Sequence, residues 1–231
     1  MTSVRYLLSL DAYRVTGNQP SARWLDEHCL ARVTGTADAV LDVANETCRD
    51  VEGDVVLLES RQSSGPHESP AHDAIACEEF VAVRYARRDI DGTFLRFDQR
   101  PPLAARHDLV PHPEGGWYRR TWVSDHMVDT QRGRRDAASA IHYLLPDGQD
   151  SRWHVVASDE MWLWHGPGLL ELWLEPEPES RLLGGPEWQN AEQQVVVPAG
   201  TWQRAHARGD VLVSCVVCPG FDFADFELRD Q

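Results

Sequence analysis

The stretch Trp153-His-Val-Val-Ala-Ser-Asp-Glu-Met-Trp-Leu-Trp164 places an imidazole, two carboxylates and three indole rings close together in the sequence. Its first four and last five residues are typical of strands, and the short link between them predicts a tight hairpin that brings His154 beside Glu160. Residues two apart in a strand share a face, so an inward Glu160 implies that Trp162 and Trp164 point inward too. The stretch therefore predicts two paired strands that carry a polar pair and aromatic rings on one face.

A remote segment adds a third polar side chain to the same expected interior. Gln203 follows the predicted turn Pro198-Ala-Gly200. It shares its strand face with the small Ala205, whereas His206 falls on the opposite face by the same count. An interior lined by imidazole, carboxylate, amide and aromatic rings is typical of a ligand pocket, which is apolar with a few polar anchors. We therefore expect Gln203 to join the polar pair inside one hollow barrel.

From about residue 101 to the end, short β-like runs alternate with turns. Turns are predicted at Gly166-Pro-Gly168 and Arg208-Gly-Asp210, among others. Many short strands at regular spacing, with no helices between them, predict an antiparallel sandwich or barrel. The expected strands are Trp117–Val123, Ala140–Leu145, Trp153–Val156, Glu160–Trp164, Leu169–Glu175, Gln193–Val197, Trp202–His206 and Val211–Val217.

Residues 1–100 combine helical and strand patterns. Apolar residues recur at helical spacing in Ser21–Arg32 and Ala37–Val51, where Ser21 and Thr36 are expected to be the N-caps. The expected strands are Asp54–Glu59, Glu78–Tyr85 and Gly92–Phe97, with a loop at Arg61–His72. We therefore predict a small α+β unit of unknown role over residues 1–100 and a β domain over residues 101–231.

The composition excludes several classes of function. The chain of 231 residues has 22 basic and 37 acidic side chains, which gives a net charge of −15. Such an acidic chain repels a phosphate backbone, so we expect no nucleic-acid partner. The sequence contains no lysine, which excludes Schiff-base chemistry, pyridoxal-phosphate anchoring and the phosphate-binding loop that needs a lysine amine.

The cysteines and the apolar runs suggest a cytoplasmic protein. Five cysteines are few and odd in number, unlike the disulfide framework of a secreted domain. Cys215 and Cys218 form a CxxC within an expected strand, where an offset of three puts the thiols on opposite faces; this favours packed structural thiols. Val4–Leu10 is too short for a signal peptide. No apolar run is long enough to span a membrane, so we expect no membrane partner.

Three motifs follow one another along residues 101–231. They are Leu109-Val-Pro-His-Pro-Glu-Gly-Gly-Trp-Tyr-Arg119, Ser158-Asp-Glu-Met-Trp162 and Cys218-Pro-Gly-Phe-Asp-Phe-Ala-Asp-Phe-Glu-Leu228. With the order of histidine, glutamate and glutamine described above, they resemble the cupin superfamily, and within it a small branch of unknown function marked by PHPEGG. The resemblance implies a mainly β fold, a double-stranded β-helix (jelly roll), which is usually dimeric and has its pocket at the barrel's open end. Its structural relatives include deoxysugar epimerases and metal-dependent oxygenases.

The sequence departs from the pattern of metal-binding cupins, which present two histidines two apart, a glutamate and a later histidine. Val156 occupies the place of the second histidine and Gln203 that of the last. Imidazole and carboxylate are good ligands for first-row metals, but a neutral amide oxygen is a weak one. We therefore favour no cofactor. A divalent transition metal held by His154, Glu160 and Gln203, in an oxygenase or hydrolase, is the alternative.

The favoured function is metal-independent acid/base catalysis on a small polar or cyclic metabolite, by an isomerase, epimerase, cyclase or dehydratase that belongs to a biosynthetic pathway. In this scheme His154 is the base, Glu160 orients it and raises its basicity, and Gln203 binds an oxygen of the substrate. The other interpretation of His154 and Glu160 is a structural hydrogen bond across a hairpin.

Four further residues are expected to bind the substrate. Trp162 and Trp164 would form a stacking wall, although single tryptophans often belong to a core. Arg119 would bind a carboxylate or phosphate together with Tyr118, but adjacent residues of a strand alternate in facing, so only one of the two reaches the ligand. A pocket that captures a ligand without chemistry is the third function considered.

Overall fold

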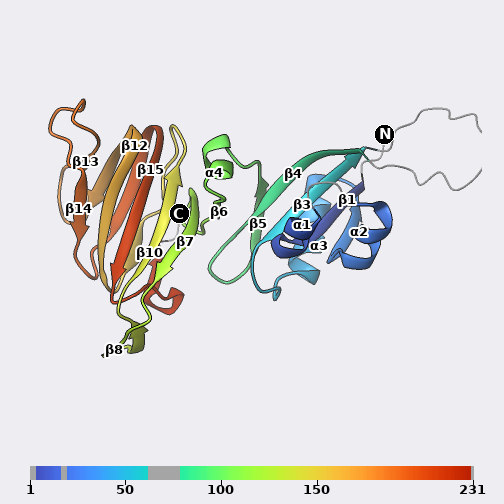
Figure 1. Cartoon of the computed structure of the whole chain (residues 1–231), viewed down its shortest axis with the longest axis horizontal. Helices are drawn as coiled ribbons and strands as arrows, with labels where there is room; N and C mark the ends of the chain where they lie inside the picture. The colour runs from blue at the N-terminus through green and yellow to red at the C-terminus, as the bar shows by residue number, and fades with distance from the viewer. Residues whose placement is uncertain (1–3, 17–19, 62–78, 230–231) are drawn as a thin grey trace, which may run out of the picture. The chain divides into compact units, whose positions relative to one another are not determined.

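The computed structural model describes residues 4–16, 20–61 and 79–229. The chain divides into two units, Met1–Arg100 and Pro101–Gln231, which are the blue-to-green and the green-to-red parts of Figure 1. Most of the predicted loop Arg61–His72 lies outside the described residues. No helix within the described residues is both long enough and apolar enough to cross a bilayer.

The first unit is an antiparallel sheet with helices packed on it. Its five strands lie in the order β2-β1-β3-β4-β5, and buried side chains such as Leu7, Val40 and Leu57 join the sheet to the helices in an apolar cluster. The α+β character expected for this part is therefore present. The elements are β1 (Val4–Ser9), α1 (Leu10–Val15), α2 (Ala22–His28), β2 (Ala31–Thr34), α3 (Ala37–Thr47), β3 (Val55–Arg61), β4 (Glu79–Arg88) and β5 (Phe94–Asp98).

The predicted N-caps of this unit are confirmed, but both predicted helices are too long, and α3 ends at Thr47, four residues before the predicted Val51. The side chain of Ser21 accepts a hydrogen bond from the Trp24 amide, and that of Thr36 accepts one from the Ala39 amide. Helix α2 ends at His28, four residues before the predicted end, because Ala31–Thr34 pairs instead with β1 as an edge strand. Pairing with a distant segment overrides local helical spacing here.

The second unit is a curled antiparallel sheet of nine strands, whose main path runs β13-β12-β15-β10-β7-β6, with β14 on β12 and β11 between β15 and β16. The predicted mainly β jelly roll is confirmed. Its elements are α4 (Pro102–Arg106), β6 (Val110–Pro111), β7 (Trp117–Val123), β8 (Met127–Thr130), β9 (Gly133–Asp136), β10 (Ser139–Leu145), β11 (His154–Val156), β12 (Asp159–Leu174), β13 (Arg181–Leu183), β14 (Gln194–Val197), β15 (Gln203–Cys218), the 3-10 turn η1 (Phe223–Asp225) and β16 (Phe226–Leu228).

Two long strands, β12 and β15, replace four of the predicted short ones. The glycine-rich segments predicted as turns lie inside these strands, where the β12–β15 ladder shifts its register near Gly166 and Gly168. A Cβ atom on Gly168 would lie 2.5 Å from the carbonyl oxygen of Arg208, so only glycine lets the two backbones approach this closely. The glycines bend the paired strands and do not end them.

The predicted hairpin between His154 and Glu160 is wrong. Strand β11 is three residues long and pairs with β15 through His154 and Gln203, and with β16 through residues 226–228. Glu160 pairs with Val217 and Val197. The imidazole and the carboxylate therefore belong to strands that are not partners, and they face one another only across the interior.

Candidate functional site

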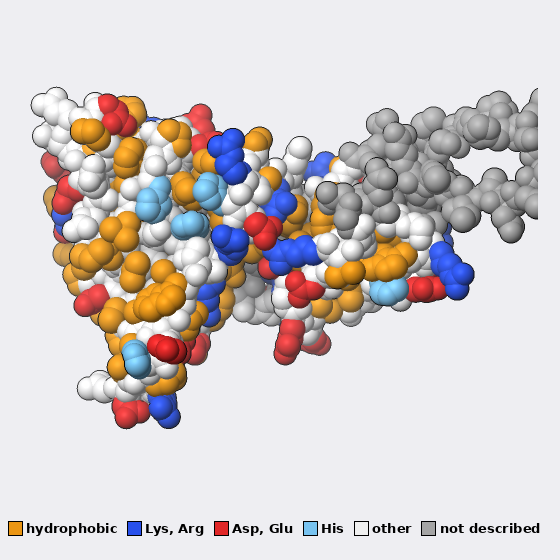
Figure 2. Space-filling view, viewed as in Figure 1, with side chains coloured by type: hydrophobic (Ala, Val, Ile, Leu, Met, Phe, Trp, Pro, Cys, Tyr) orange, Lys and Arg blue, Asp and Glu red, His pale blue; other side chains and the backbone are white. Residues whose placement is uncertain are grey.

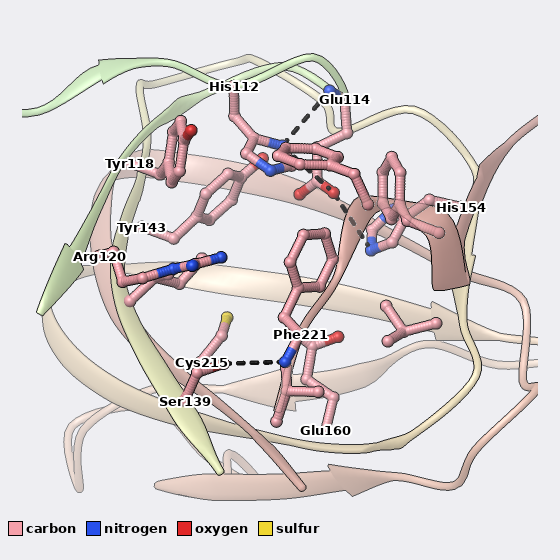
Figure 3. Close-up of a pocket in the computed structure, with 15 residues that line it drawn as sticks. His112, Glu114, Tyr118, Arg120, Ser139, Tyr143, His154, Glu160, Cys215 and Phe221 are labelled. Atoms are coloured by element: carbon pink, nitrogen blue, oxygen red, sulfur yellow. Dashed lines mark hydrogen bonds and ion pairs between the residues drawn. The ribbon is translucent and has the colours of Figure 1, made fainter. Parts of the chain in front are cut away.

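A cavity opens inside the second unit, among the strands β7, β10, β11, β12, β15 and the C-terminal segment (Figure 3). The space not filled by atoms is about 510 Å³, including the part that is open to solvent. Polar and titratable groups lie on its walls among aromatic and aliphatic side chains. The lining residues are His112, Glu114, Tyr118, Arg120, Ser139, Ile141, Tyr143, His154, Val156, Glu160, Cys215, Val217, Phe221, Phe223 and Phe226.

His154 is buried in this wall with its ring held in one orientation. Its Nδ1 lies 2.8 Å from the carbonyl oxygen of Arg152, and a carbonyl oxygen only accepts, so Nδ1 carries the proton and Nε2 of the neutral ring has a free lone pair. Burial lowers the pKa of His154, against the opposing effects of the Glu160 charge and the Arg152 carbonyl. The neutral ring presents Nε2 as a base.

Glu114 is a site residue that the sequence patterns did not single out. Its side chain is 7% exposed, and its Oε2 lies 3.5 Å from Nε2 of His154. Burial raises the pKa of Glu114 to about 8, although a hydrogen bond from Tyr143 opposes the shift. The carboxyl is therefore protonated at neutral pH. The PHPEGG motif was the available signal, but nothing in it indicates which of its residues faces the interior.

The two glycines that follow Glu114 explain how a turn delivers a carboxyl group into a β interior. Gly115 and Gly116 have φ angles of 117° and 62°, which side-chain-bearing residues rarely adopt. A Cβ atom on Gly116 would lie 2.7 Å from the carbonyl oxygen of Leu144. The tight turn at Gly115 and Gly116 lets the backbone pass close to β10 while Glu114 points inward (Figure 3).

His112 places a second imidazole beside the Glu114 carboxyl. Its Nδ1 accepts a hydrogen bond from the Glu114 amide at 3.4 Å and lies 3.5 Å from Glu114 Oε2. Oε2 of Glu114 therefore lies close to two ring nitrogens that carry no proton, Nδ1 of His112, whose lone pair accepts from the amide, and Nε2 of His154. Two unprotonated nitrogens beside the oxygen favour the protonated form of the carboxyl. His112 packs against Tyr118, with ring centroids 4.6 Å apart, and it also lines the cavity.

A second buried carboxyl, Glu160, is held by a chain of hydrogen bonds. Nε2 of Gln203 donates to Glu160 Oε2 at 2.6 Å, and Nε1 of Trp162 donates to Gln203 Oε1 at 3.0 Å. Burial raises the pKa of Glu160, and Glu114 adds to the increase, while His154 and hydrogen bonds from Gln203 and Cys215 oppose it. Both ends of the Gln203 amide are engaged within the protein, and Gln203 does not line the cavity.

The other predicted binding residues are divided between the cavity and its surroundings. Tyr118 lines the cavity, and Arg120, not Arg119, lies beside it there. Trp162 is buried in the apolar core. Trp164 packs on that core and donates from Nε1 to the carbonyl oxygen of Gly168. Neither tryptophan is a lining residue, and the aromatic rings that line the cavity belong to tyrosines, phenylalanines and His112.

Arg119 lies on the outer face, beside a row of histidines. It pairs with His142 across β7 and β10, and the ring of His142 is 5.8 Å from His107 and 6.0 Å from His165, measured between centroids. Figure 2 shows histidine side chains gathered on this face of the second unit. His206 also faces away from the cavity, as strand parity predicted, and its Nδ1 lies 3.0 Å from Asp150.

The C-terminal segment covers the cavity with aromatic rings. Phe221, Phe223 and Phe226 all line the cavity, and the ring of Phe223 stacks on His112 with centroids 6.1 Å apart. The segment is fastened by Asp225, whose two oxygens accept hydrogen bonds from Arg135 at 2.8 and 3.1 Å. These hydrogen bonds lower the pKa of Asp225.

The two thiols of the CxxC differ in environment. Cys215 is buried and lines the cavity, whereas Cys218 is exposed, so they face opposite ways as strand parity predicted. The expectation of two packed thiols is wrong for Cys218. Burial raises the pKa of Cys215 well above its usual value, which keeps this thiol protonated and makes it a poor nucleophile.

The side chains present do not fit the metal site considered for His154, Glu160 and Gln203. The amide oxygen of Gln203 accepts from Trp162 and its NH₂ group donates to Glu160, so the amide is held in place by the protein and does not line the cavity. Within residues 4–16, 20–61 and 79–229, no three His, Cys, Asp or Glu side chains are grouped so that they could hold a metal ion. We derive no step through a metal.

Comparisons with known proteins concern the second unit. The family described as Cupin superfamily (DUF985) matches residues 102–229. A hypothetical protein from Leishmania major is 34% identical, with a TM-score of 0.50, and the match covers 55% of this chain and 85% of that one. A protein from Shewanella oneidensis is also 34% identical, with a TM-score of 0.51 and coverage of 56% and 83%. No protein with a curated description matches this sequence.

Proposed function

This chain belongs to the cupin superfamily, in the family described as DUF985, and on that premise we propose that its barrel catalyses proton transfer on a small polar or cyclic metabolite without a metal. The reaction class is isomerisation, epimerisation, cyclisation or dehydration at a carbon next to a carbonyl group. Each of these reactions needs a base to remove one proton and an acid to deliver another.

The observation that carries the proposal is the pairing of Glu114 with His154. The pKa of the carboxylic acid is raised to about 8 and the pKa of the imidazole is lowered, so at neutral pH the proton stays on Glu114 and His154 is free to accept another. Pairs of titratable groups whose environments move their pKa values apart are typical of acid/base assignments. The 3.5 Å separation allows both groups to contact one small molecule.

The proton balance of the proposed step closes within the cavity. Nε2 of His154 takes the proton from the carbon, the electron pair of that C–H bond forms the enol double bond, and the Glu114 hydroxyl gives its proton to the carbonyl oxygen. The imidazolium and the carboxylate produced in this way attract one another, which limits the cost of separating charge in a buried site. The His154 imidazolium then returns a proton to carbon while the enol O–H gives its proton back to the Glu114 carboxylate. Protonation of a different carbon completes an isomerisation, and protonation of the opposite face of the same carbon completes an epimerisation.

Glu160 is proposed as a positioning residue. Gln203 and Cys215 donate to Glu160, so its carboxyl is fixed and cannot rotate freely into the cavity. Its charge favours the imidazolium form of His154, as expected for a carboxylate that supports a base. The task of fixing the tautomer, which the sequence assigned to Glu160, falls to the carbonyl of Arg152.

Solvent exchange tests the proposal even while the natural substrate is unidentified. The protein is incubated in D₂O with a panel of cyclic ketones, aldoses and 2-hydroxy acids, and deuterium incorporation at carbon is followed by proton NMR. We expect catalysed exchange for part of the panel and a loss of roughly 100-fold or more in His154→Gln. His206→Gln removes a histidine outside the cavity and should retain the full rate.

Three results would contradict the proposal. Exchange that persists in His154→Gln would show that this residue is not the base, and a probe that binds but is recovered without deuterium would support simple ligand capture. Stoichiometric transition metal in protein purified without chelator, lost in His154→Ala, would support the metal-dependent alternative.

A further inference from the structure

Arg120 is a cation in the cavity wall that the proposed proton transfer does not use. It lies on β7 opposite Ile141 of β10, while Arg119 lies opposite His142 and Tyr118 opposite Tyr143. Because facing alternates along a strand, Arg120 and Tyr118 share the inner face and Arg119 lies on the outer one. Figure 3 shows the guanidinium of Arg120 extending into the cavity between Tyr143 and Cys215.

No hydrogen bond or ion pair joins Arg120 to another residue of the described chain. Other arginines of the same unit are engaged: Arg132 and Arg135 both pair with Asp225. Among the described side chains that line the cavity, Arg120 is also the one with a permanent positive charge. A guanidinium that faces a cavity with its donors unused is available to a ligand.

We propose that Arg120 binds a carboxylate of the ligand, so that the compound taken into this cavity is a small organic acid with one negative charge. The inference rests on the proposed function for the chemistry that follows binding, but the binding itself can be measured separately. A guanidinium matches a carboxylate with two parallel N–H···O hydrogen bonds.

The other lining groups favour a monoanion with an apolar body. One guanidinium balances one negative charge, and no second arginine is among the described lining residues, so a second negative charge on the ligand would be buried without a partner. Much of the remaining lining is apolar, including Ile141, Val217 and Phe221. The ligand is therefore expected to carry its charge at one end and hydrocarbon or an unsaturated ring at the other.

Because the chain has a negative net charge, an anionic ligand needs a local cation such as Arg120 in order to bind. At −15, the protein repels anions at long range. An exposed arginine is screened by solvent and salt, so the attraction that Arg120 supplies is local and should weaken as the salt concentration rises.

Matched pairs of probes test the inference. Carboxylates and their neutral carboxamides of the same size, such as cyclopentanecarboxylate and cyclopentanecarboxamide or benzoate and benzamide, are titrated at pH 7 and followed by saturation-transfer NMR. In the wild-type protein we expect the carboxylate of a pair to bind roughly tenfold more tightly than its amide, as for a hydrogen bond to a charged group. Arg120→Gln should abolish this preference, and Arg120→Lys should retain only part of it.

Arg119→Gln is the matched control, since it removes the same charge from the adjacent position on the outer face and should keep the preference. The inference is overturned if the wild-type protein binds no carboxylate of the panel, if amides bind equally well, or if Arg119→Gln loses the preference and Arg120→Gln keeps it. A phosphate monoester that binds more tightly than the matched carboxylate would also overturn it.

Glu114→Gln separates this inference from the proposed function. The variant should lose catalysed deuterium exchange and keep the carboxylate preference, because Arg120 is unchanged. Carboxylate binding without exchange in the wild-type protein would contradict the catalytic proposal alone, and exchange without any carboxylate preference would contradict the role of Arg120 alone. Circular dichroism spectra of the Arg120 variants establish that they are folded.

Discussion

The apolar core of the barrel and the polar cavity beside it are built from the same strands. On β12 and β15, Leu170, Leu172, Ala205 and Ala207 are fully buried in the core, while Glu160 lies in the cavity wall. The core positions pack hydrocarbon against hydrocarbon. The cavity positions bury carboxyl, imidazole and thiol groups, at a cost in desolvation that the core does not have.

The comparison indicates that the core stabilises the fold, whereas the polar groups of the cavity lower its stability and serve the proposed chemistry. The long curled strands need only an alternating pattern and a few glycines to form, and the core supplies the stabilising burial. Burial of the Glu114 carboxyl, whose pKa is raised to about 8, does not increase the free energy of unfolding. Buried titratable groups of this kind are more frequent at functional sites than elsewhere.

The largest expected effect lies in the core. Leu172→Ala should lower the free energy of unfolding by about 2–5 kcal/mol, because it removes three buried carbon atoms and leaves a void in a close-packed region. Val196→Ala, at a position that is 47% exposed on β14, is the control and should change stability by less than about 1 kcal/mol. Urea unfolding measures both. A similar small loss for the two variants would show that the core is not the stabilising region.

The second effect is an increase in the free energy of unfolding when the buried carboxyl of Glu114 is replaced. The pKa of Glu114 is about 8 in the folded protein against 4.5 as its ordinary value. Between these values the folded state holds a proton that the unfolded state has lost, so stability falls as the pH rises from about 4.5 to about 8. Glu114→Gln has no titrating group at this position, so its stability does not fall in this way, and it should be more stable than the wild type by roughly 3 kcal/mol at pH 7.

The pH dependence of that gain is the sharper measurement. The stability difference between Glu114→Gln and the wild type should be small near pH 4.5 and should grow up to about pH 8, as followed by thermal unfolding. Glu177→Gln removes a carboxyl from an exposed position and is the control, which should change the stability at pH 7 by less than about 0.5 kcal/mol. If Glu114→Gln were less stable than the wild type at pH 7, the Glu114 carboxyl would stabilise the fold, contrary to this prediction.

The smallest effect concerns the segment that covers the cavity. Asp225→Asn weakens the hydrogen bonds to Arg135 and the ion pair with Arg132, and it should cost about 1–2 kcal/mol at pH 7, because the amide keeps an acceptor oxygen but loses the charge. The pKa of Asp225 is lowered, so its contribution is present above its ordinary value of 3.8 and disappears as the pH falls through the lowered value.

Hydrogen exchange locates the same effect. Amides of residues 221–228 should exchange faster in Asp225→Asn, while amides of β10 should keep their wild-type rates. Equal rates throughout would show that the aromatic cover is held by packing of Phe221, Phe223 and Phe226 and not by the ion pair.

Much of the fold follows from the sequence because it depends on local patterns. Alternation of apolar and polar residues predicts the strands, and Ser21 and Thr36 predict two helix starts. The incorrect predictions concern strands whose partners lie far away in the sequence. Local patterns do not show that Gly168 packs against Arg208, and so they suggest turns where two strands continue side by side. They also do not show that β11 pairs with β15 and β16, since that choice is made by segments far along the chain.

For the site too, local sequence patterns predict some residues, and strand pairing or backbone geometry decides the others. The sequence brings His154 and Glu160 into one interior, because strand parity and the order of motifs suffice for that. The register of β7 decides that Arg120 and not Arg119 faces inward, and it depends on pairing with β10. The inward direction of Glu114 depends on the backbone angles of the two glycines that follow it. Neither property can be read from residue types alone.

NMR titration of the two central groups tests the account most directly. In protein labelled with ¹⁵N-histidine, with His154 assigned by comparison with His154→Gln, we predict that His154 is neutral at pH 7, protonated on Nδ1, and titrates below its ordinary pKa of 6.5. In ¹³C-labelled protein the Glu114 carboxyl should titrate with a pKa of about 8. A cationic His154 beside an ionised Glu114 at pH 7, or a His154 that carries its proton on Nε2, would contradict the proposed pair of base and acid.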